Sequence, residues 1–542
     1  MFIYKKPPRP HLKGEPLLHE NHRRPVTRRD FIAAGMLSGP AMVIGPAWLG
    51  AVLRANRANA ALDPDIANLL ANTQCNVPTN SAGIPFICFD LAGGANLVGS
   101  EVLVGQQGGQ TAFLSTAGYE LLGVPGNMVP SSSANIDPSL GLLWHADGAI
   151  KRGILSKATT PATAAGTSGG VFCAESQNDT QANPHNPMYG IAMAGAQGQL
   201  LTLIGTQSSV SGGNSQAPMA LINPALQPTT ISQPSDSTAL VPMPPGGGAQ
   251  DPLAVAVLES QTRISGGSTP QAGQGDTAAF TGALAAPSGG TPGVQLYADA
   301  NSDAALKNQV RCAYVKSAHT ADLFGNPSAL DPTQDLLITG GAAPIFTAAD
   351  FSDSDSAATA TVMKLVIDGF AAAGTITLGG YDYHDGTRAT GETRNFQAGQ
   401  LIGAVLEYAQ RRKSPVMIYV ISDGSLNSNM MVDSSTAGRG KLGWQGDNSS
   451  VASTFFLVYS PSGRPTLRNG AAGQQIGYFS AGGNVVSSSS LVGNAVTTLV
   501  QVLILNYMGL AGTTAQYNTV FPMLPLGSAS QLDALTVFQP IV

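Results

Sequence analysis

The sequence predicts an α/β protein with a mostly parallel sheet and helices on both of its faces. Short, wholly apolar segments recur along the chain, and such segments are typical of parallel strands that are buried on both sides. After residue 345 they alternate with segments of helical periodicity, an order that requires crossover connections between parallel strands. Only 11% of the 542 residues are charged, and 64 glycines and 36 prolines favour long polar loops around this core.

The first half of the chain contains three predicted strands and one long insertion region. The segment IPFICF predicts a strand at 84–89 that ends in a glycine-rich turn, and two more buried strands are predicted near 169–176 and at 200–205. Between about 206 and 300 the chain is dense in Ser, Gly, Gln, Pro and Thr, which favours loops over regular elements. We expect a single domain over residues 61–542 that contains this insertion region.

Helices and strands alternate in the second half of the chain. Helices are predicted at 357–374, 392–412 and 489–509, and strands at 375–380, 415–424 and 453–460. In open sheets of this kind, ligands gather beyond the carboxyl ends of the strands. We therefore expect functional residues in the turns after Phe89, Gly380 and Ile421.

The distribution of charge argues against one class of partner. The first sixty residues carry ten Lys and Arg against three Asp and Glu, which leaves 17 basic and 30 acidic residues in the remainder. A body with a net charge of −13 repels phosphate backbones, so nucleic acid is not an expected partner. The same charge is compatible with a cation-binding site.

The N-terminal segment resembles a twin-arginine signal over residues 1–60. Arg28 and Arg29 precede an uncharged stretch rich in Gly and Ala, and Ala58 and Ala60 form a small-residue cleavage site. Cleavage is expected after Ala60. The alternative is an uncleaved transmembrane anchor, because the stretch is long enough to span a bilayer, but its glycines and prolines dilute its apolarity.

Such a leader implies a destination and a first partner. The twin-arginine export machinery carries folded proteins, often with a metal or cofactor already bound. We therefore expect a periplasmic or extracellular protein after export, and the leader is compatible with a metal site.

Four cysteines follow the leader, at Cys75, Cys88, Cys173 and Cys312. An oxidising compartment permits disulfides, and four cysteines allow three pairings, among which the sequence does not choose. Cys88 and Cys173 lie in apolar segments, so buried free thiols are an equal alternative for them. No CxxC spacing occurs, which argues against a zinc site built on cysteines.

Acidic and imidazole groups follow the predicted strands. Asp90 follows FICF, Asp382 and His384 follow TLGG, and Asp423 follows YVIS. A single aspartate in such a turn is usually a cap or a turn residue. In an extended backbone, however, Asp382 and His384 project to the same side and could meet one cation. The alternative is a loop histidine that bonds a neighbouring carboxylate such as Asp385.

The types of these side chains indicate which cation they would bind. A carboxylate with an imidazole suits zinc, iron or manganese, and carboxylates with water suit magnesium or calcium. We expect one divalent cation: Zn, Mg, Ca or Mn. His185, in a loop after a predicted strand, is a further candidate ligand, whereas His145 beside Trp144 is expected to pack in the core and His319 to lie on the surface.

Several segments together resemble a known family. They are FDLAGGAN, AAAGTITLGGYDYHD, PVMIYVISDGS and LVQVLILNYMGL with TVFP. They are similar to the twin-arginine-exported domain-of-unknown-function 1501 family, distant relatives of alkaline phosphatases and sulfatases. The resemblance is best over about 345–530 and thin over 84–205. It implies an alkaline-phosphatase-like three-layer α/β/α sandwich with a mostly parallel sheet, long polar insertions and metal bound at the strand ends.

The resemblance also implies roles for individual residues. In that superfamily two divalent cations hold a phosphate or sulfate ester while a Ser or Thr attacks it. The most specific motif, Gly-Gly-aromatic-Asp-x-His, places metal ligands at Asp382 and His384. By the same resemblance, Asp423 takes the acidic position after the next strand, and His185 matches a histidine that the family keeps.

Three departures weaken the match to an active enzyme. Pro184 replaces the serine before that histidine, and Asn96 replaces an acid or serine in the first turn. The late Asp-His-Gly-His type of motif retains only Asp447. Two metals need about six to eight protein donors, and the sequence offers at most six with two imidazoles.

These observations lead to two main hypotheses. The first is an exported, non-catalytic alkaline-phosphatase-like protein that binds one cation and acts as a surface or assembly component with cell-surface or self-assembly partners. The alternative is a metal-dependent phosphate- or sulfate-ester hydrolase whose ligands are Asp90, His185, Asp382, His384 and Asp423. A third hypothesis, a carbohydrate or peptidoglycan binder, rests only on Trp144, Trp444 and scattered tyrosines as stacking surfaces.

Overall fold

The computed structural model describes residues 83–176, 183–240, 327–448 and 453–542. The elements below belong to the compact unit formed by Pro64–Thr238 and Asn326–Val542. The predicted leader, Cys75, Cys312, His319 and most of the predicted insertion region lie outside the described residues.

An eight-stranded sheet forms the centre of this unit, in the order β12-β4-β11-β8-β1-β7-β5-β6. Its strands are β1 (Phe86–Gly93), β4 (Thr167–Cys173), β5 (Leu201–Gly205), β6 (Thr229–Thr230), β7 (Ala371–Tyr381), β8 (Val416–Ser422), β11 (Ser453–Tyr459) and β12 (Gln475–Ile476). All neighbouring pairs are parallel except those that β11 makes with β4 and β8. The predicted α/β class with a mostly parallel sheet is therefore confirmed.

The central strands are buried on both faces, which explains their apolar sequences. β1 lies between β7 and β8, and Phe86 pairs with both Ala373 and Met417. Continuous apolar sequence is what a parallel strand with both faces covered requires. The carboxyl ends of these three strands meet at one edge of the sheet, because Gly93 pairs with Tyr381 and the last residues of β8 pair with β1.

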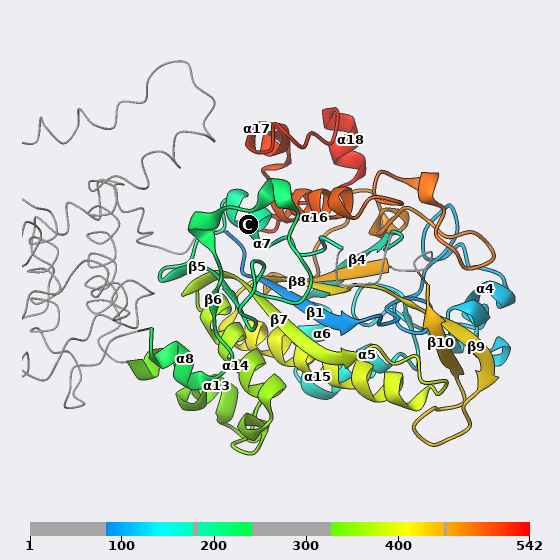
Figure 1. Cartoon of the computed structure of the whole chain (residues 1–542), viewed down its shortest axis with the longest axis horizontal. Helices are drawn as coiled ribbons and strands as arrows, with labels where there is room; N and C mark the ends of the chain where they lie inside the picture. The colour runs from blue at the N-terminus through cyan, green and yellow to red at the C-terminus, as the bar shows by residue number, and fades with distance from the viewer. Residues whose placement is uncertain (1–82, 177–182, 241–326, 449–452) are drawn as a thin grey trace, which may run out of the picture. The chain divides into compact units, whose positions relative to one another are not determined.

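Helices cover both faces of the sheet (Figure 1). One face carries α5 (Ala149–Lys157), α6 (Pro161–Ala165), α13 (Leu336–Thr339), α14 (Ser354–Ile367) and α15 (Ala389–Arg412). The other carries α7 (Met188–Met193), α16 (Val496–Leu510), α17 (Tyr517–Val520) and α18 (Ala529–Ala534). α16 is apolar on nearly all sides because it packs between the sheet and these shorter helices. None of the described helices combines the length and apolarity that a membrane span needs.

The predicted helix at 357–374 is wrong over its last seven residues, 368–374. α14 ends at Ile367, and residues 371–374 already belong to β7. Gly369, with φ of 79°, reverses the chain between the two elements. A Cβ at Gly374 would lie 2.5 Å from a Val362 methyl group, so the small residues that resemble a helix instead let α14 pack closely on the strand.

The strand predicted at 453–460 is present as β11, and it runs antiparallel to β8 in this mostly parallel sheet. No helix lies between these two strands in the described chain. Instead, β9 (Leu426–Val432) and β10 (Leu442–Asp447) form an antiparallel ribbon outside the main sheet. A connection without a crossover helix can return the chain antiparallel to its neighbour.

The remaining elements are short. They are α4 (Thr116–Leu121), α8 (Pro234–Thr238), the bridge pair β2 (Ile136–Asp137) and β3 (Trp144–His145), and the single-turn helices η2 (Gly126–Met128), η3 (Ser133–Asn135), η4 (Met219–Leu221), η5 (Pro224–Leu226), η6 (Pro327–Leu330), η7 (Pro332–Gln334), η8 (Asp350–Ser352), η10 (Ala471–Gln474), η11 (Ser487–Ser489) and η12 (Thr514–Gln516). The described part of the insertion region, 206–240, contains only such short elements, as its composition predicts.

Cys88 and Cys173 are free thiols in the core. Burial raises the pKa of both thiols above the usual value, and for Cys88 the nearby Asp90 raises it further. The alternative of buried free thiols therefore holds for these two cysteines.

Candidate metal centre

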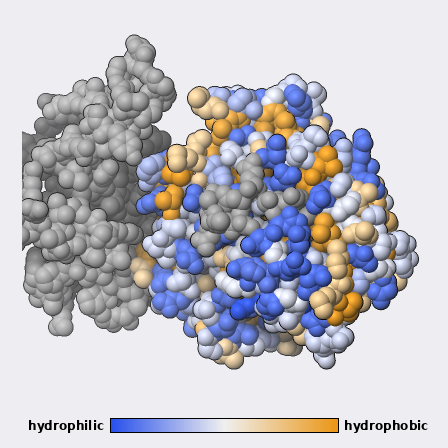
Figure 2. All heavy atoms as spheres, turned by 45° about the vertical axis from the view of Figure 1, so that its right-hand side comes forward, coloured by the Kyte–Doolittle hydropathy of each residue, from blue (hydrophilic) through white to orange (hydrophobic). Residues whose placement is uncertain are grey.

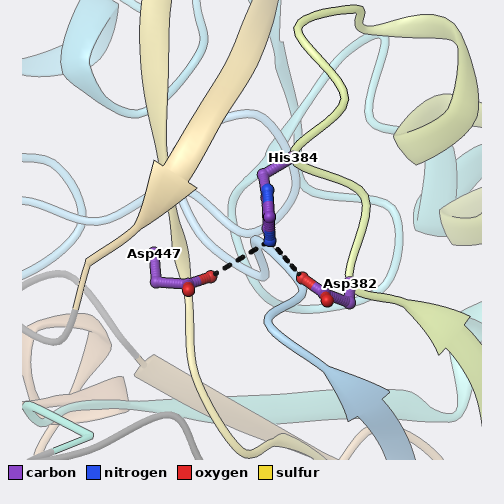
Figure 3. A group of neighbouring side chains, drawn as sticks. All are labelled: Asp382, His384 and Asp447. Carbon is purple, nitrogen blue, oxygen red and sulfur yellow. Dashed lines mark ion pairs between the residues drawn. The ribbon is translucent and has the colours of Figure 1, made fainter.

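Three side chains converge at the carboxyl edge of the sheet: Asp382, His384 and Asp447 (Figure 3). The Nε2 atom of His384 lies 2.8 Å from Oδ1 of Asp382 and 3.8 Å from Oδ1 of Asp447. One ligand atom from each residue lies within 4.8 Å of the other two. In the described residues this is the one group of three or more His, Cys, Asp or Glu side chains close enough to hold a metal ion.

Two separate segments of chain supply the three side chains. Asp382 and His384 follow the last residue of β7, and Asp447 is the last residue of β10. Tyr383 between the first two is buried, whereas the side chains of Asp382, His384 and Asp447 are 62%, 40% and 44% exposed. The chain therefore alternates after β7, and the predicted same-side projection of Asp382 and His384 is confirmed.

A glycine-rich turn after β1 lies directly beneath the cluster. A Cβ on Gly93 would overlap the backbone nitrogen of Asp382, and one on Gly94 would lie 3.5 Å from Oδ1 of Asp447. Gly93 also has φ of 134°, a conformation that other residues rarely adopt. Gly93 thus lets the end of β1 approach the backbone of Asp382, and Gly94 lies next to Asp447 in ordinary van der Waals contact.

Asp423 holds this turn in place. Its Oδ1 accepts a hydrogen bond of 2.8 Å from the Gly93 amide, and its side chain is buried. Its backbone carbonyl accepts a bond of 2.9 Å from the Asn183 side chain. Asp423 therefore supports the turn from below and does not belong to the three-residue cluster.

Asp90 has a similar supporting position elsewhere in the core. It lies within β1, fully buried, and both of its oxygens accept hydrogen bonds from Ser215, at 2.7 Å from the amide and 2.9 Å from the hydroxyl. Burial raises the pKa of this carboxyl, although the bonds from Ser215 oppose the shift. Asp90 ties the loop around residue 215 to the sheet.

His185 is also buried, with 3% of its surface exposed, and burial lowers its pKa to about 4. Neither ring nitrogen has a hydrogen-bond partner among the described residues. Of the five predicted ligands, the structure brings together Asp382 and His384, and it does not include Asp90, His185 or Asp423 in their cluster.

Asp385, the predicted alternative partner of His384, is engaged elsewhere. Its Oδ1 accepts hydrogen bonds from the amide and hydroxyl of Thr387, and its Oδ2 accepts one from Thr390. These bonds hold the pKa of Asp385 below its usual value despite some burial. The ion pairs of His384 run to Asp382 and Asp447.

His145 packs in the core, as predicted. Its Nδ1 accepts a hydrogen bond of 3.2 Å from the Asp147 amide, and its Nε2 lies 3.0 Å from the Met128 carbonyl. This pairing requires the neutral tautomer with the proton on Nε2. Burial, together with the positive charges of Lys441 and Arg388, lowers the pKa of His145 to about 4.

The geometry of the cluster fits a small divalent cation. Zinc binds nitrogen and carboxylate oxygen at about 2.0–2.2 Å, so the donors of a tetrahedral site lie about 3.4 Å apart. The separations here bracket that value, and exposed side chains can close the difference by small rotations. Three protein donors leave at least one coordination position open to water or to a group from another molecule.

Asp447 is the ligand that the predicted set omits. The sequence marks it only as the surviving acid of a late motif, inside the segment GWQGD. Its position depends on the β9–β10 ribbon, in which Asp447 pairs with Leu426. β9 begins at Leu426, four residues after the end of β8, so the ribbon places Asp447 beside the carboxyl edge of the sheet.

Comparison with known proteins identifies no family for this chain. No family model matches the chain, and no curated protein matches it significantly. Function is therefore inferred from the residues and their geometry.

Proposed function

We propose that this protein is an exported, alkaline-phosphatase-like protein without catalytic activity, which binds one divalent cation and acts as a surface or assembly component. The cation is held by Asp382, His384 and Asp447. The convergence of these three side chains, from segments about sixty residues apart, is the observation that carries the proposal.

The donor set favours zinc or manganese over magnesium or calcium. An imidazole nitrogen with two carboxylates is a borderline-soft set, whereas magnesium and calcium prefer oxygen ligands alone. The exposure of all three residues means that the open coordination positions face solvent. A carboxylate or imidazole of a partner could occupy them, which is how a surface cation contributes to assembly.

The surroundings of the ribbon are compatible with this role. The side of the molecule that Figure 2 turns toward the viewer mixes hydrophilic and hydrophobic residues. The ribbon itself exposes three consecutive hydrophobic side chains, Met430, Met431 and Val432. Three exposed apolar side chains on a surface that is otherwise mixed do not make a large apolar interface by themselves. A bridging cation and polar contacts are a better match to it.

The number of donors argues against two-metal hydrolysis. That chemistry uses two cations about 3.5–4 Å apart, each with its own ligands. The described residues contain one three-residue cluster, and Asp423 and Asp90, which would be the next carboxylates, support the Gly93 amide and Ser215. Pro184 also stands where the resemblance would require the hydroxyl nucleophile.

Export is part of the proposal, and the site is consistent with it. The three ligands and the Gly93–Gly94 turn come together only in the folded chain. The twin-arginine pathway, which the leader resembles, carries proteins that have already folded. A cation could therefore be bound before export.

A titration of the purified protein with Zn²⁺, Mn²⁺, Mg²⁺ and Ca²⁺ tests the proposal. We expect one site per chain, tighter binding of Zn²⁺ or Mn²⁺, and a cation-dependent rise in the midpoint of thermal unfolding. His384→Ala should abolish both effects. Asp385→Asn is the matched control, because Asp385 is a neighbouring exposed acid that is not in the cluster, and it should bind like the wild type.

The hydrolase alternative is favoured by one observation, the open coordination position of a three-ligand site, which is typical of catalytic zinc. An assay on an aryl phosphate and an aryl sulfate separates the two functions. Turnover that His384→Ala abolishes would replace the non-catalytic proposal with the hydrolase. Cation binding without turnover supports a surface or assembly role.

A further inference from the structure

Two buried aromatic rings lie beneath the cluster and connect the segments that supply its ligands. Tyr383 lies between Asp382 and His384, and Trp444 precedes Asp447 by three residues. The ring centroids of Tyr383 and Trp444 are 6.3 Å apart, with 42° between the ring planes. Both side chains are almost completely buried.

Helix α15 presses against both rings. A Cβ on Gly391 would lie 2.8 Å from Nε1 of Trp444 and 2.9 Å from Cε2 of Tyr383, so only glycine leaves room for them. The guanidinium carbon of Arg388 lies 4.4 Å from the Trp444 ring centroid, a cation–π contact in a buried setting. Trp444 is therefore enclosed by Tyr383, Gly391 and Arg388.

Buried hydrogen bonds keep these neighbours of Trp444 in place. The Tyr383 hydroxyl accepts a bond of 2.9 Å from the Asn96 amide and bonds Oδ1 of Asn395 at 3.1 Å. Arg388 Nε donates to Glu392 Oε1 at 3.0 Å. The slot around Trp444, formed by Tyr383, Gly391 and Arg388, is thus lined by side chains that hydrogen bonds hold in place.

The same glutamate holds the start of β10. Lys441, the residue before β10, donates a 2.7 Å hydrogen bond to Glu392 Oε1 and is fully buried. Burial lowers the pKa of Lys441, while the carboxylate of Glu392 opposes that shift. The beginning of β10 is anchored to α15 independently of its strand partner.

The ladder between β9 and β10 is interrupted twice before it reaches Asp447. Its register shifts between Leu442 and Trp444 and again between Trp444 and Gly446. The last two pairs, Gly446 with Asn427 and Asp447 with Leu426, are in register with each other, but the two shifts separate them from the pairing at the start of β10. Trp444 lies between the two register shifts. Because its side chain is enclosed, it can fix the position of the residues that follow it, including Asp447.

We infer that Trp444 is a positioning residue for the cation site: by packing between Tyr383 and Arg388, it holds Asp447 against the Asp382–His384 pair. This inference rests on the proposed cation binding. In this inference the two ligand-bearing segments are held together by the contact between Tyr383 and Trp444. Neither of these two side chains is a ligand of the cation. Supporting residues of this kind change metal affinity by about 10- to 100-fold when they are replaced.

A double-mutant cycle on Zn²⁺ affinity tests the inference. The full chain is titrated as wild type, Trp444→Leu, Asp447→Asn and the double variant. We expect Trp444→Leu to weaken binding about tenfold in the wild-type background and less than about twofold in the Asp447→Asn background. Equal losses in both backgrounds, or no loss in Trp444→Leu, would overturn the inference.

Two further variants separate positioning from loss of folding. Trp144→Leu removes another fully buried tryptophan, which packs on Phe455 away from the cluster, and should lower stability without changing Zn²⁺ affinity. Trp444→Phe keeps an aromatic ring in the slot and should recover most of the affinity that Trp444→Leu loses. If Trp444→Leu does not fold, the cycle is run with Gly391→Ala, whose methyl group would displace the Trp444 ring. No affinity loss in Gly391→Ala, or a loss that persists at full size in the Asp447→Asn background, contradicts positioning.

The wild-type titration distinguishes the two possible failures. If wild type binds Zn²⁺ and His384→Ala does not, the cation site stands, and only the Trp444 variants decide the inference. If wild type does not bind Zn²⁺, the proposed function fails, and the inference fails with it.

Discussion

At the scale of single residues, the geometry of the site depends on close contact between backbone segments as well as on the three ligand side chains. Gly93 and Gly94 bring the turn after β1 against Asp382 and Asp447, and the carboxylate of Asp423 binds the Gly93 amide. The segment FDLAGGAN therefore shapes the site although none of its residues belongs to the cluster. Asp423 lies at the predicted edge of the sheet, in a supporting position.

Gly93→Ala tests this contact. The new methyl group would overlap the backbone of Asp382, and the φ of 134° is unfavourable for alanine. We expect a loss of about 2–4 kcal/mol in the free energy of unfolding, measured with urea, together with weaker Zn²⁺ binding.

Gly379→Ala is the matched control for that variant. Gly379 lies in the motif that contains Asp382 and His384, close to the end of β7, but a Cβ there would meet no atom within 4 Å. It should change neither stability nor Zn²⁺ affinity appreciably. Equal effects of the two substitutions would contradict the contact at Gly93.

The sequence predicts two of the three cluster residues for a clear physical reason. Asp382 and His384 are two positions apart after an apolar strand, and the spacing alone places them on one side of an extended chain. Asp447 lacks such a local signal, because its neighbours in space are distant in sequence. Asp90 and Asp423 follow apolar segments in the sequence in the same way, but Asp90 lies inside β1 and Asp423 directly after β8. Hydrogen bonds from Ser215 and Gly93 give these two carboxylates other roles.

At the scale of elements, the start of α15 depends on a carboxylate from the ribbon connection. The helix has no side-chain cap of its own, and Oδ2 of Asp433 accepts hydrogen bonds from the amides of Arg388 and Ala389, at 2.9 and 3.1 Å. Hydrogen bonds, first from Ser435 and then from these amides, lower the pKa of Asp433 to about 2. Asp433 thus couples the ribbon to the helix that encloses Trp444.

Asp433→Ala should lower the free energy of unfolding by about 1 kcal/mol at pH 7, the usual value of such a cap. Because the folded-state pKa is lowered, this contribution is complete above the ordinary aspartate value and is lost as the pH falls toward 2. Urea unfolding at several pH values between 7 and 3 measures the difference between variant and wild type. A difference that grows on acidification would contradict the capping role.

The elements that can be predicted from the sequence are those with a strong apolar pattern. β1, β8 and α15 lie close to their predicted ranges because burial on both faces or on one helical stripe imposes a strong pattern. The ribbon is different: β9 is half exposed and irregular, and its pairing with β10 follows from the fold around it. The direction of β11 depends on that ribbon, so the sequence pattern does not reveal it.

At the scale of the whole molecule, buried neutral histidines make stability depend on pH. The pKa of His145 is lowered to about 4 by burial and by Lys441 and Arg388, while Asp147 and the Met128 carbonyl oppose the shift. A histidine with a lowered folded-state pKa contributes fully above its ordinary value near 6.5. Its contribution is lost as the pH falls from there toward 4, since the unfolded chain then binds a proton that the folded chain does not.

We therefore expect the free energy of unfolding to fall by about 1 kcal/mol per pH unit for this group between pH 6 and 4.5. His145→Gln should show a shallower pH dependence over this interval, although its stability at pH 7 is lower. Chemical unfolding of both proteins at half-unit steps measures the two slopes. Identical slopes would mean that His145 binds its proton equally in the folded and the unfolded chain, which contradicts the lowered pKa.

The most direct measurement of the central claim is an anomalous diffraction map from crystals of the protein soaked in Zn²⁺. The account predicts a peak within about 2.0–2.2 Å of Nε2 of His384 and of one carboxylate oxygen from each of Asp382 and Asp447. Peaks at other sites with none between these three side chains would contradict it.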